Sequence, residues 1–191
     1  MIKAIIFDIG GVIVPDLTKK VMGLAKNKNF TKNIHKYSNY LDSGKITLSK
    51  LEKIFNKKYE VNLDFRKMYL DSAKKSKINK NILKLILKLR KNYKVIYLSN
   101  TFKEHYLIRK KQKIYVNFLF GIDSYKVKLR KPYRIIYKLA LRKLNLNPEE
   151  CVFIDDREDN IKTAKRLRIN VILFKNYKKL IKDLTKFDIK I

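Results

Sequence analysis

The sequence predicts an α/β fold in which a doubly wound parallel sheet carries an inserted, small bundle of helices. Three observations lead to this fold class. Short apolar runs rich in β-branched and aromatic residues recur along the chain, helical patterns separate most of them, and one long stretch has helical patterns without a convincing strand. Alternating strands and helices are typical of a parallel sheet with helices on both faces.

The predicted strands are four short apolar runs. Buried parallel strands form nearly continuous hydrophobic segments, because both of their faces are covered. A fifth, weaker strand is expected near Phe118–Ile122. The four main runs are Ala4–Phe7, Val95–Leu98, Cys151–Ile154 and Val171–Phe174.

Two segments between these runs have the periodicity of amphipathic helices. Asn79–Arg90 carries its apolar residues three and four positions apart, which places them on one face of a helix. Tyr133–Leu144 repeats this arrangement directly after Pro132, a residue that favours the first turn of a helix. Both helices are therefore expected to pack on the sheet.

Residues 16–78 form a stretch that is too long for a simple crossover between two strands. It contains a break at Ser43-Gly44, and Thr47 then begins a predicted amphipathic helix as its N-cap. An inserted bundle over the carboxyl ends of the strands explains this stretch, since that edge of an α/β sheet holds ligands. We expect a core domain of residues 1–15 and 79–191 and a helical cap of residues 16–78.

Composition limits the size and the setting of the protein. A chain of 191 residues, 46% of them hydrophobic, suffices for one α/β domain with a modest second module. Cys151 is the only cysteine, which excludes an intramolecular disulfide and fits a reducing compartment. The apolar N-terminal run is interrupted by Asp8 and is too short to span a bilayer. A cytoplasmic protein without a membrane segment is expected.

The net charge of +30 suggests an acidic partner such as nucleic acid, a membrane surface or a phosphorylated metabolite. Lysine and arginine, however, occur in nearly every segment rather than in one stripe. A compositional bias toward Lys, Ile and Asn explains this scatter without any partner, whereas an electrostatic footprint requires clustering. Nucleic acid stays an alternative partner that charge clustering does not support.

Polar side chains follow the predicted strands at the points where the strands end. Asp8 follows the first run, Ser99-Asn100-Thr101 follows the second, and Asp155-Asp156 closes the third, while Lys131-Pro132 precedes the helix that leads into it. The carboxyl ends of parallel strands meet at one edge, so these groups converge on one crevice. Converging carboxylates repel one another, and a divalent cation is the usual way to stabilise them.

These four segments resemble the ordered motifs of the haloacid dehalogenase (HAD) superfamily of hydrolases. The matching segments are Phe7–Ile13, Leu98–Thr101, Lys131-Pro132 and Phe153–Asn160, and their order and spacing cover Ile2 to about Phe174. The resemblance implies a Rossmann-like, HAD-like sheet with residues 16–78 in the place of a helical cap. It is nearest to the branch of sugar-phosphate phosphatases and the phosphatase domain of soluble epoxide hydrolase.

The resemblance also implies roles at the first strand and around a magnesium ion. Asp8 would be the nucleophile through one oxygen and a Mg²⁺ ligand through the other, and Gly10 would offer its backbone carbonyl to Mg²⁺. Gly10 and Gly11 would let backbone N–H groups approach a phosphoryl oxygen. Asp156 would bind Mg²⁺ directly, and Asp155 through water or from the second layer.

For the transferring phosphoryl group, the resemblance implies three further contacts. Ser99 would donate a hydrogen bond to it with help from the amide of Asn100, and Lys131 would neutralise both the phosphate and Asp8. Asn160 would stabilise the Asp155-Asp156 loop.

One position departs from the family pattern. Most phosphatases of the superfamily place a second aspartate two residues after the nucleophile as general acid and base, but that position here is Gly10. Loss of a general acid costs a factor of about 10² to 10⁴ in rate. Substrates with good leaving groups, such as anomeric sugar phosphates or acyl phosphates, are therefore expected, and Asp16 or His35 from the cap are candidate substitutes.

The sequence thus predicts a Mg²⁺-dependent phosphatase that hydrolyses a small phosphorylated metabolite through an aspartyl-phosphate on Asp8. Two alternatives remain open. One is carbon–halogen hydrolysis, which uses a similar aspartate without metal. The other is a catalytically weak protein on the same scaffold that binds nucleic acid or another polyanion. The sequence leaves the substrate and the oligomeric state undetermined.

Overall fold

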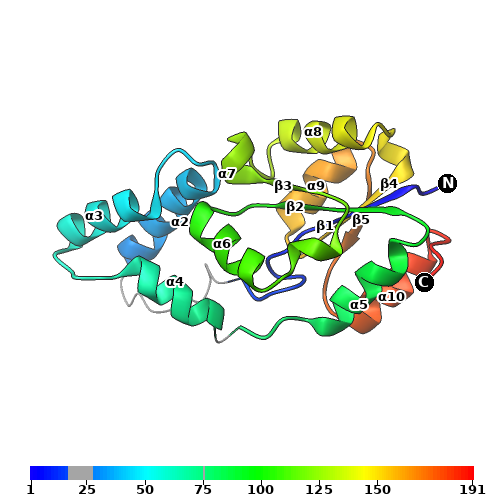
Figure 1. The fold of residues 1–191 in the computed structure, drawn as a ribbon. Helices are drawn as coiled ribbons and strands as arrows, with labels where there is room; N and C mark the ends of the chain where they lie inside the picture. Colours follow the sequence, from blue (N-terminus) through cyan, green and yellow to red (C-terminus); the bar gives the residue numbers. More distant parts are fainter. Residues whose placement is uncertain (17–27, 75) are drawn as a thin grey trace.

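The computed structural model describes residues 1–16, 28–74 and 76–191. Figure 1 shows a central sheet with helices above and below it, and a group of helices beyond one end of the sheet. The two termini lie at the opposite end (Figure 1).

The sheet has five parallel strands in the order β3-β2-β1-β4-β5. The predicted α/β class with a parallel sheet is confirmed, and the weak fifth strand forms as the short edge strand β3. Because β1 lies in the centre, its last residue Phe7 pairs with Tyr97 on one side and Ile154 on the other. The strands are β1 (Ala4–Phe7), β2 (Lys94–Ser99), β3 (Gly121–Asp123), β4 (Cys151–Asp155) and β5 (Asn170–Leu173).

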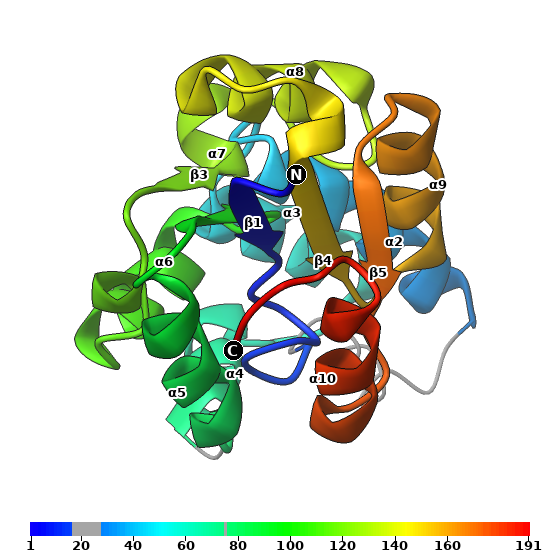
Figure 2. The ribbon, with the colours of Figure 1, turned by 90° about the vertical axis from the view of Figure 1, so that its right-hand side faces the viewer.

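Helices cover both faces of this sheet (Figure 2). The helices α5 (Lys80–Leu89) and α10 (Tyr177–Thr185) pack on one face, where Ile5 and Phe7 of β1 point. The helices α8 (Arg134–Leu144) and α9 (Glu158–Arg166) pack on the other face, where Ala4 and Ile6 point. Alternate residues of a strand point to opposite faces, so continuous apolar runs are needed to fill both cores.

Local capping explains where several predicted helices begin and end. The Asn79 side chain accepts a hydrogen bond from the Ile82 N–H at 3.3 Å, so Asn79 is the N-cap and α5 begins one residue after the start of the predicted segment Asn79–Arg90. The Thr47 hydroxyl accepts from the Lys50 N–H at 3.2 Å, as expected for the N-cap of α3 (Leu48–Tyr59). At the end of α8, Asn145 adopts a left-handed φ of 52°.

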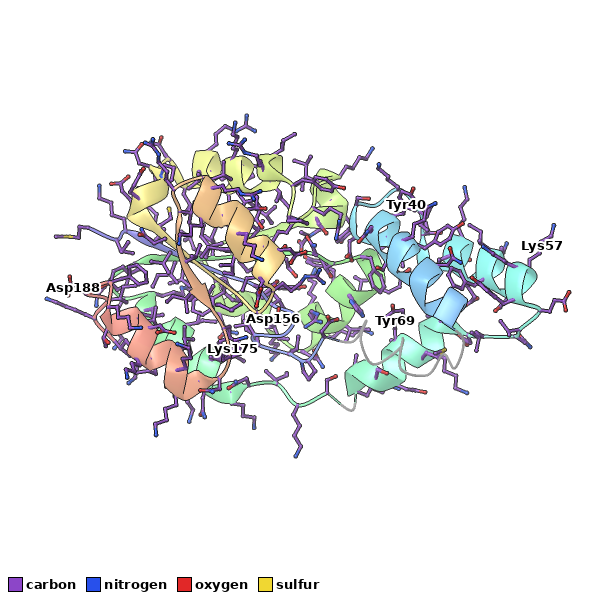
Figure 3. The ribbon with its side chains drawn as sticks, turned by 180° about the vertical axis from the view of Figure 1, so that it is seen from behind. Tyr40, Lys57, Tyr69, Asp156, Lys175 and Asp188 are labelled. Atoms are coloured by element: carbon purple, nitrogen blue, oxygen red, sulfur yellow. The ribbon has the colours of Figure 1, made fainter. Side chains whose placement is uncertain are left out.

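Three helices between β1 and β2 form what we call the inserted bundle: α2 (Lys28–Asp42), α3 and α4 (Phe65–Lys74). They share a small apolar core of their own, which Phe102 from the loop after β2 joins. Figure 3 shows Lys57 on the side of this bundle away from the sheet, and Tyr69 of α4 on the side nearer to Asp156. The division of the chain at residues 16 and 78 stays a prediction.

The remaining elements connect the strands around the sheet edge. They are α6 (Lys103–Lys111), α7 (Ser124–Val127) and the short 3-10 helices Tyr115–Asn117 and Pro148–Glu150. Among the described residues, the helices are all too short or too polar to cross a membrane.

Candidate active site

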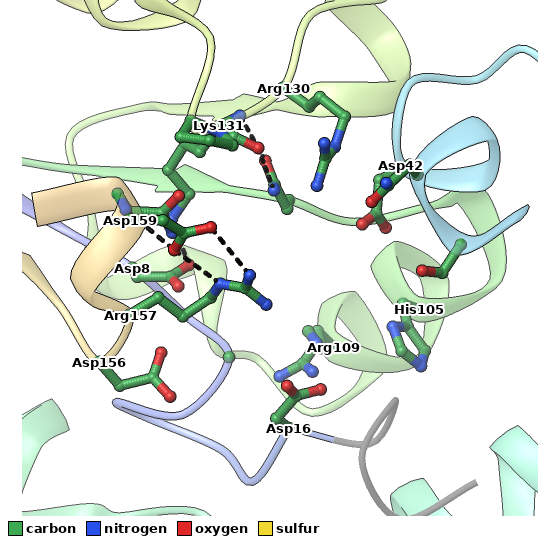
Figure 4. A pocket seen from close by; sticks show the side chains of 16 residues that line it. Asp8, Asp16, Asp42, His105, Arg109, Arg130, Lys131, Asp156, Arg157 and Asp159 are labelled. Carbon is green, nitrogen blue, oxygen red and sulfur yellow. Dashed lines mark hydrogen bonds and ion pairs between the residues drawn. The ribbon is translucent and has the colours of Figure 1, made fainter. Parts of the chain in front are cut away.

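A polar cavity of about 290 Å³ opens where the carboxyl ends of β1, β2 and β4 face the inserted bundle (Figure 4). Its wall contains acidic side chains from the sheet edge and from the inserted bundle, and basic side chains from segments that follow β2. The acidic side chains are Asp8, Asp16, Asp42, Asp156 and Asp159, and the basic ones are His105, Arg109, Arg130, Lys131 and Arg157.

A fully buried lysine joins two of the predicted carboxylates. The Lys131 ammonium lies 3.0 Å from Oδ1 of Asp8 and 2.6 Å from Oδ2 of Asp155, and its side chain is completely shielded from solvent. The same Asp8 oxygen accepts the Ile9 N–H at 2.6 Å. These two donors fix the orientation of the Asp8 carboxylate at the end of β1.

Burial and charge set the protonation of this group. Burial raises the pKa of Asp8 to about 8, although the positive charge of Lys131 opposes the shift. Burial alone would lower the pKa of Lys131, but the carboxylates of Asp155 and Asp8 raise it, so Lys131 stays charged. A second positive charge near Asp8 would favour its ionised form further.

The loop after β4 holds Asp155 and Asp156 in different environments. Asp155 is fully buried, and its carboxylate accepts the Arg157 N–H at 2.9 Å and the Asn160 amide at 3.0 Å in addition to Lys131. Asp156 is half-buried and lines the cavity. Asp155 is therefore saturated with hydrogen-bond donors, whereas Asp156 faces the space where a ligand would lie.

The three carboxylates fit a divalent cation. Asp8, Asp155 and Asp156 each offer an oxygen, and these oxygens all lie within 4.8 Å of one another. Oxygen ligands of this kind suit a hard cation such as Mg²⁺.

Glycine at position 11 makes room for one of these carboxylates. Gly11 has a φ of +77°, and a Cβ atom built there would overlap the carboxylate of Asp156. Its N–H donates to the Val14 carbonyl at 2.7 Å, so this group closes the loop after β1. Gly10 lines the cavity, and nothing lies within 4 Å of a Cβ atom built at that position.

The segment after β2 reaches the site through Asn100. The Asn100 side chain accepts the Lys131 N–H at 2.8 Å and donates to the Lys131 carbonyl at 2.9 Å, which fixes the backbone that carries the buried lysine. Ser99 ends β2 and is only 2% exposed. Within the described residues, Ser99 is not part of the cavity wall, whereas Asn100 is.

The two suggested substitutes for the missing acid differ in what the structure describes. Asp16 lines the cavity, whereas the side chain of His35 lies outside the described residues. Sequence reasoning missed Asp42, His105 and Arg109, which also line the cavity. Asp42 directly precedes the predicted break at Ser43-Gly44, so its place at a turn was the available signal. For His105 and Arg109, which lie on α6, the sequence carried no such signal.

The fold and this site define an α/β protein whose reactive groups sit at the carboxyl edge of a parallel sheet, around an aspartate held by a buried lysine. The family model described as haloacid dehalogenase-like hydrolase matches residues 2–168. The chain therefore belongs to the haloacid dehalogenase-like hydrolases, as the motif resemblance predicted.

Solved structures share this fold over most of the chain. A HAD family enzyme of Bacteroides thetaiotaomicron, crystallised as a variant with magnesium and inorganic phosphate, is 24% identical, with a TM-score of 0.77 and coverage of 94% of this chain and 99% of that one. A predicted HAD-like hydrolase of Porphyromonas gingivalis is 21% identical, with a TM-score of 0.76 and full coverage of both chains, 100% and 100%. The L-2-haloacid dehalogenase of Xanthobacter autotrophicus is 16% identical, with a TM-score of 0.65 and coverage of 100% and 85%.

Proposed function

We propose that this hydrolase is a Mg²⁺-dependent phosphatase that acts on a small phosphorylated metabolite through an aspartyl-phosphate on Asp8. The observation that carries the proposal is the contact of one buried lysine with both Asp8 and Asp155, beside a set of three carboxylates that fits a divalent cation. The Bacteroides enzyme of the same fold was crystallised with magnesium and inorganic phosphate, which supports the proposed ligands.

In the proposed reaction, an Asp8 carboxylate oxygen attacks phosphorus and the bond from phosphorus to the leaving oxygen breaks. Water then attacks the phosphorus of the aspartyl-phosphate and restores Asp8. Bound Mg²⁺ would supply the positive charge that lets a carboxylate approach a phosphate. Asp8, Asp156 and the carbonyl of Gly10 are the groups proposed to hold it directly, with Asp155 acting through water or from the second layer.

Lys131 has two tasks in this proposal. Its charge favours ionised Asp8 before the reaction and offsets the negative charge of the phosphoryl group during it. Asn100 positions Lys131 through both backbone hydrogen bonds. The Ser99 hydroxyl and the Asn100 backbone amide remain the proposed donors to the phosphoryl oxygens.

Carbon–halogen hydrolysis is the second candidate, because a dehalogenase shares this fold and was crystallised with chloropropionic acid covalently bound. The Asp155-Asp156 pair argues for the phosphatase, because converging carboxylates beside Asp8 need a cation. Carbon–halogen hydrolysis needs no metal ion. Halide release from 2-chloropropionate that chelator does not reduce would reverse this order.

The decisive experiment is a screen of para-nitrophenyl phosphate and a panel of phosphorylated metabolites with purified protein, with Mg²⁺ and with excess chelator. We expect turnover that needs Mg²⁺, and Asp8→Asn should lower it by more than about a hundredfold because the nucleophile is lost. Circular dichroism of Asp8→Asn controls for the fold. Absence of turnover across the whole panel would remove the proposal.

The setting of the protein belongs to the same proposal. A single buried cysteine, Cys151, supports a reducing, cytoplasmic location.

A further inference from the structure

The position of the missing general acid is empty space in the structure. Gly10 lines the cavity two residues after Asp8, and a Cβ atom built there would meet nothing within 4 Å. Hydrolysis of a phosphate ester with a poor leaving group still requires a proton donor for the leaving oxygen. Another residue that faces the cavity must supply it if the proposed phosphatase activity is to extend to such esters.

Asp42 is a carboxyl group on the opposite side of the cavity from Asp8 (Figure 4). It is the last residue of α2, so it belongs to the inserted bundle, whereas Asp8 belongs to the sheet. Attacking and leaving oxygens lie roughly in line in phosphoryl transfer. With Asp8 attacking from the sheet, the leaving oxygen points toward the bundle and therefore toward Asp42.

The surroundings of Asp42 suit a group that exchanges protons near neutral pH. Burial raises its pKa to about 7, and the positive charge of Arg130 opposes this shift. The other ionisable groups that face it come from the core, from the loop after β1 and from the bundle. They are Asp16, Arg157, Lys131 and Tyr69, with His105 and Arg109 further along the same cavity wall.

An unsatisfied nitrogen marks the same side of the cavity as a place for a polar ligand. His105 is only 6% exposed, and its Nε2 atom has no hydrogen-bond partner among the described residues. Burial lowers its pKa well below the usual value, so the ring is neutral at physiological pH. Such a nitrogen would accept a hydrogen bond from a hydroxyl of the leaving group, or donate one to it.

The turn that carries Asp42 is docked on the core. Gly44 adopts a φ of +64°, and a Cβ atom built there would lie 2.6 Å from the Tyr125 carbonyl oxygen of α7. The Ser43 hydroxyl donates to the Asn39 carbonyl at 2.8 Å and closes the end of α2. The close approach of this turn to α7 holds Asp42 toward the cavity.

We propose that Asp42 is the acid and base of the reaction, in place of the carboxylate that is absent at Gly10. The inference rests on the proposed phosphatase activity. As the bond from phosphorus to the leaving oxygen breaks, its electron pair goes to that oxygen, and protonated Asp42 gives it a proton to release the alcohol. Asp42, now a carboxylate, takes a proton from the water that attacks the aspartyl-phosphate, so inorganic phosphate forms and the acid is restored.

The test compares two substrates of nearly equal size, para-nitrophenyl phosphate and phenyl phosphate, whose leaving groups differ in basicity. Phenolate is the stronger base and needs the proton more. Asp42→Asn should therefore lower kcat/KM for phenyl phosphate by about 10²- to 10⁴-fold, and much less for para-nitrophenyl phosphate. The fall of wild-type kcat/KM for phenyl phosphate above about pH 7 should disappear in the variant.

Asp71→Asn is the matched control, because Asp71 lies on α4 and is not part of the cavity wall. It should leave both substrates unaffected. Gly44→Ala keeps every charge but forces the Asp42 turn away from α7, and it should show the same dependence on the leaving group. This second variant decides the matter if Asp42→Asn does not fold.

Equal losses for the two substrates in Asp42→Asn would assign Asp42 to binding and overturn the inference. A leaving-group-dependent loss in Asp16→Asn, without one in Asp42→Asn, would overturn it in favour of Asp16. In both cases wild-type turnover would remain, and the proposed phosphatase function would stand. A wild-type protein without phosphatase activity would remove both proposals together.

Discussion

Gly11→Ala should weaken metal binding at this site while the fold survives. Two features of the structure make position 11 sensitive: its φ of +77° and the overlap that a Cβ atom would have with the Asp156 carboxylate. A left-handed backbone conformation destabilises an L-residue by about 1–2 kcal/mol. Replacing glycine by alanine also lowers the conformational entropy of the unfolded chain, which stabilises the folded protein by about 0.4–1 kcal/mol. The metal-free protein should therefore lose only about 1 kcal/mol of stability.

The larger effect falls on the metal. Because the new methyl group must displace the Asp156 carboxylate, we expect Mg²⁺ to bind about 10–100 times more weakly, the loss typical of disturbed groups around a metal ion. Isothermal titration calorimetry of Mg²⁺ measures this directly. The rise in the unfolding midpoint on adding Mg²⁺ should shrink in parallel, since bound metal stabilises only the folded chain.

Gly10→Ala is the matched control for this prediction. It adds the same methyl group to the neighbouring residue, which has no positive φ and open space around a built Cβ. The backbone carbonyl that Gly10 is proposed to offer remains. If the two alanine variants bound Mg²⁺ with equal affinity, the steric argument about Asp156 would be wrong.

Three further outcomes are expected. Lys131→Met leaves two buried carboxylates without their shared cation. In the presence of chelator, the protein should lose about 3–5 kcal/mol of stability, and its unfolding midpoint should fall by roughly 6–20 °C. The control Lys138→Met, at an exposed position, should change stability little. The folded-state pKa of Asp42 is about 7, against 3.8 for a free aspartate, so the folded chain binds more protons than the unfolded chain between these values. The contribution of Asp42 to the unfolding free energy should therefore fall as pH rises from about 4 to about 7. Urea denaturation should show that this decrease is absent in Asp42→Asn. The exposed bundle residues Lys45, Lys50 and Lys53 would steer phosphoanions to the cavity, so kcat/KM should fall with rising salt; a flat profile would make the +30 charge a compositional background.

Much of the fold follows from short segments of sequence. The apolar runs at Ala4–Phe7 and Cys151–Ile154 became the two paired central strands, and Thr47 became the predicted N-cap. These features depend on residues only a few positions apart, and the physics of hydrogen bonding and burial within such a window is nearly independent of the rest of the chain. The order of strand ends then placed Asp8, Asp155 and Asp156 at one edge.

The cavity opposite that edge required the tertiary structure. Asp42 lines the cavity next to a turn that comes close to α7 at Gly44, and Asn100 bonds to Lys131 from 31 residues away. Ser99 ends β2 with a side chain that is only 2% exposed, so its hydrogen bond to a phosphoryl group stays a prediction.

The sequence by itself therefore determined the sheet, its flanking helices and which strand ends carry chemical groups, because periodicity and capping are local. Only the tertiary structure decided which of those groups touch and which side chains of the inserted bundle complete the wall. Such contacts depend on how two separately packed cores meet, and no periodic pattern in either segment records that geometry.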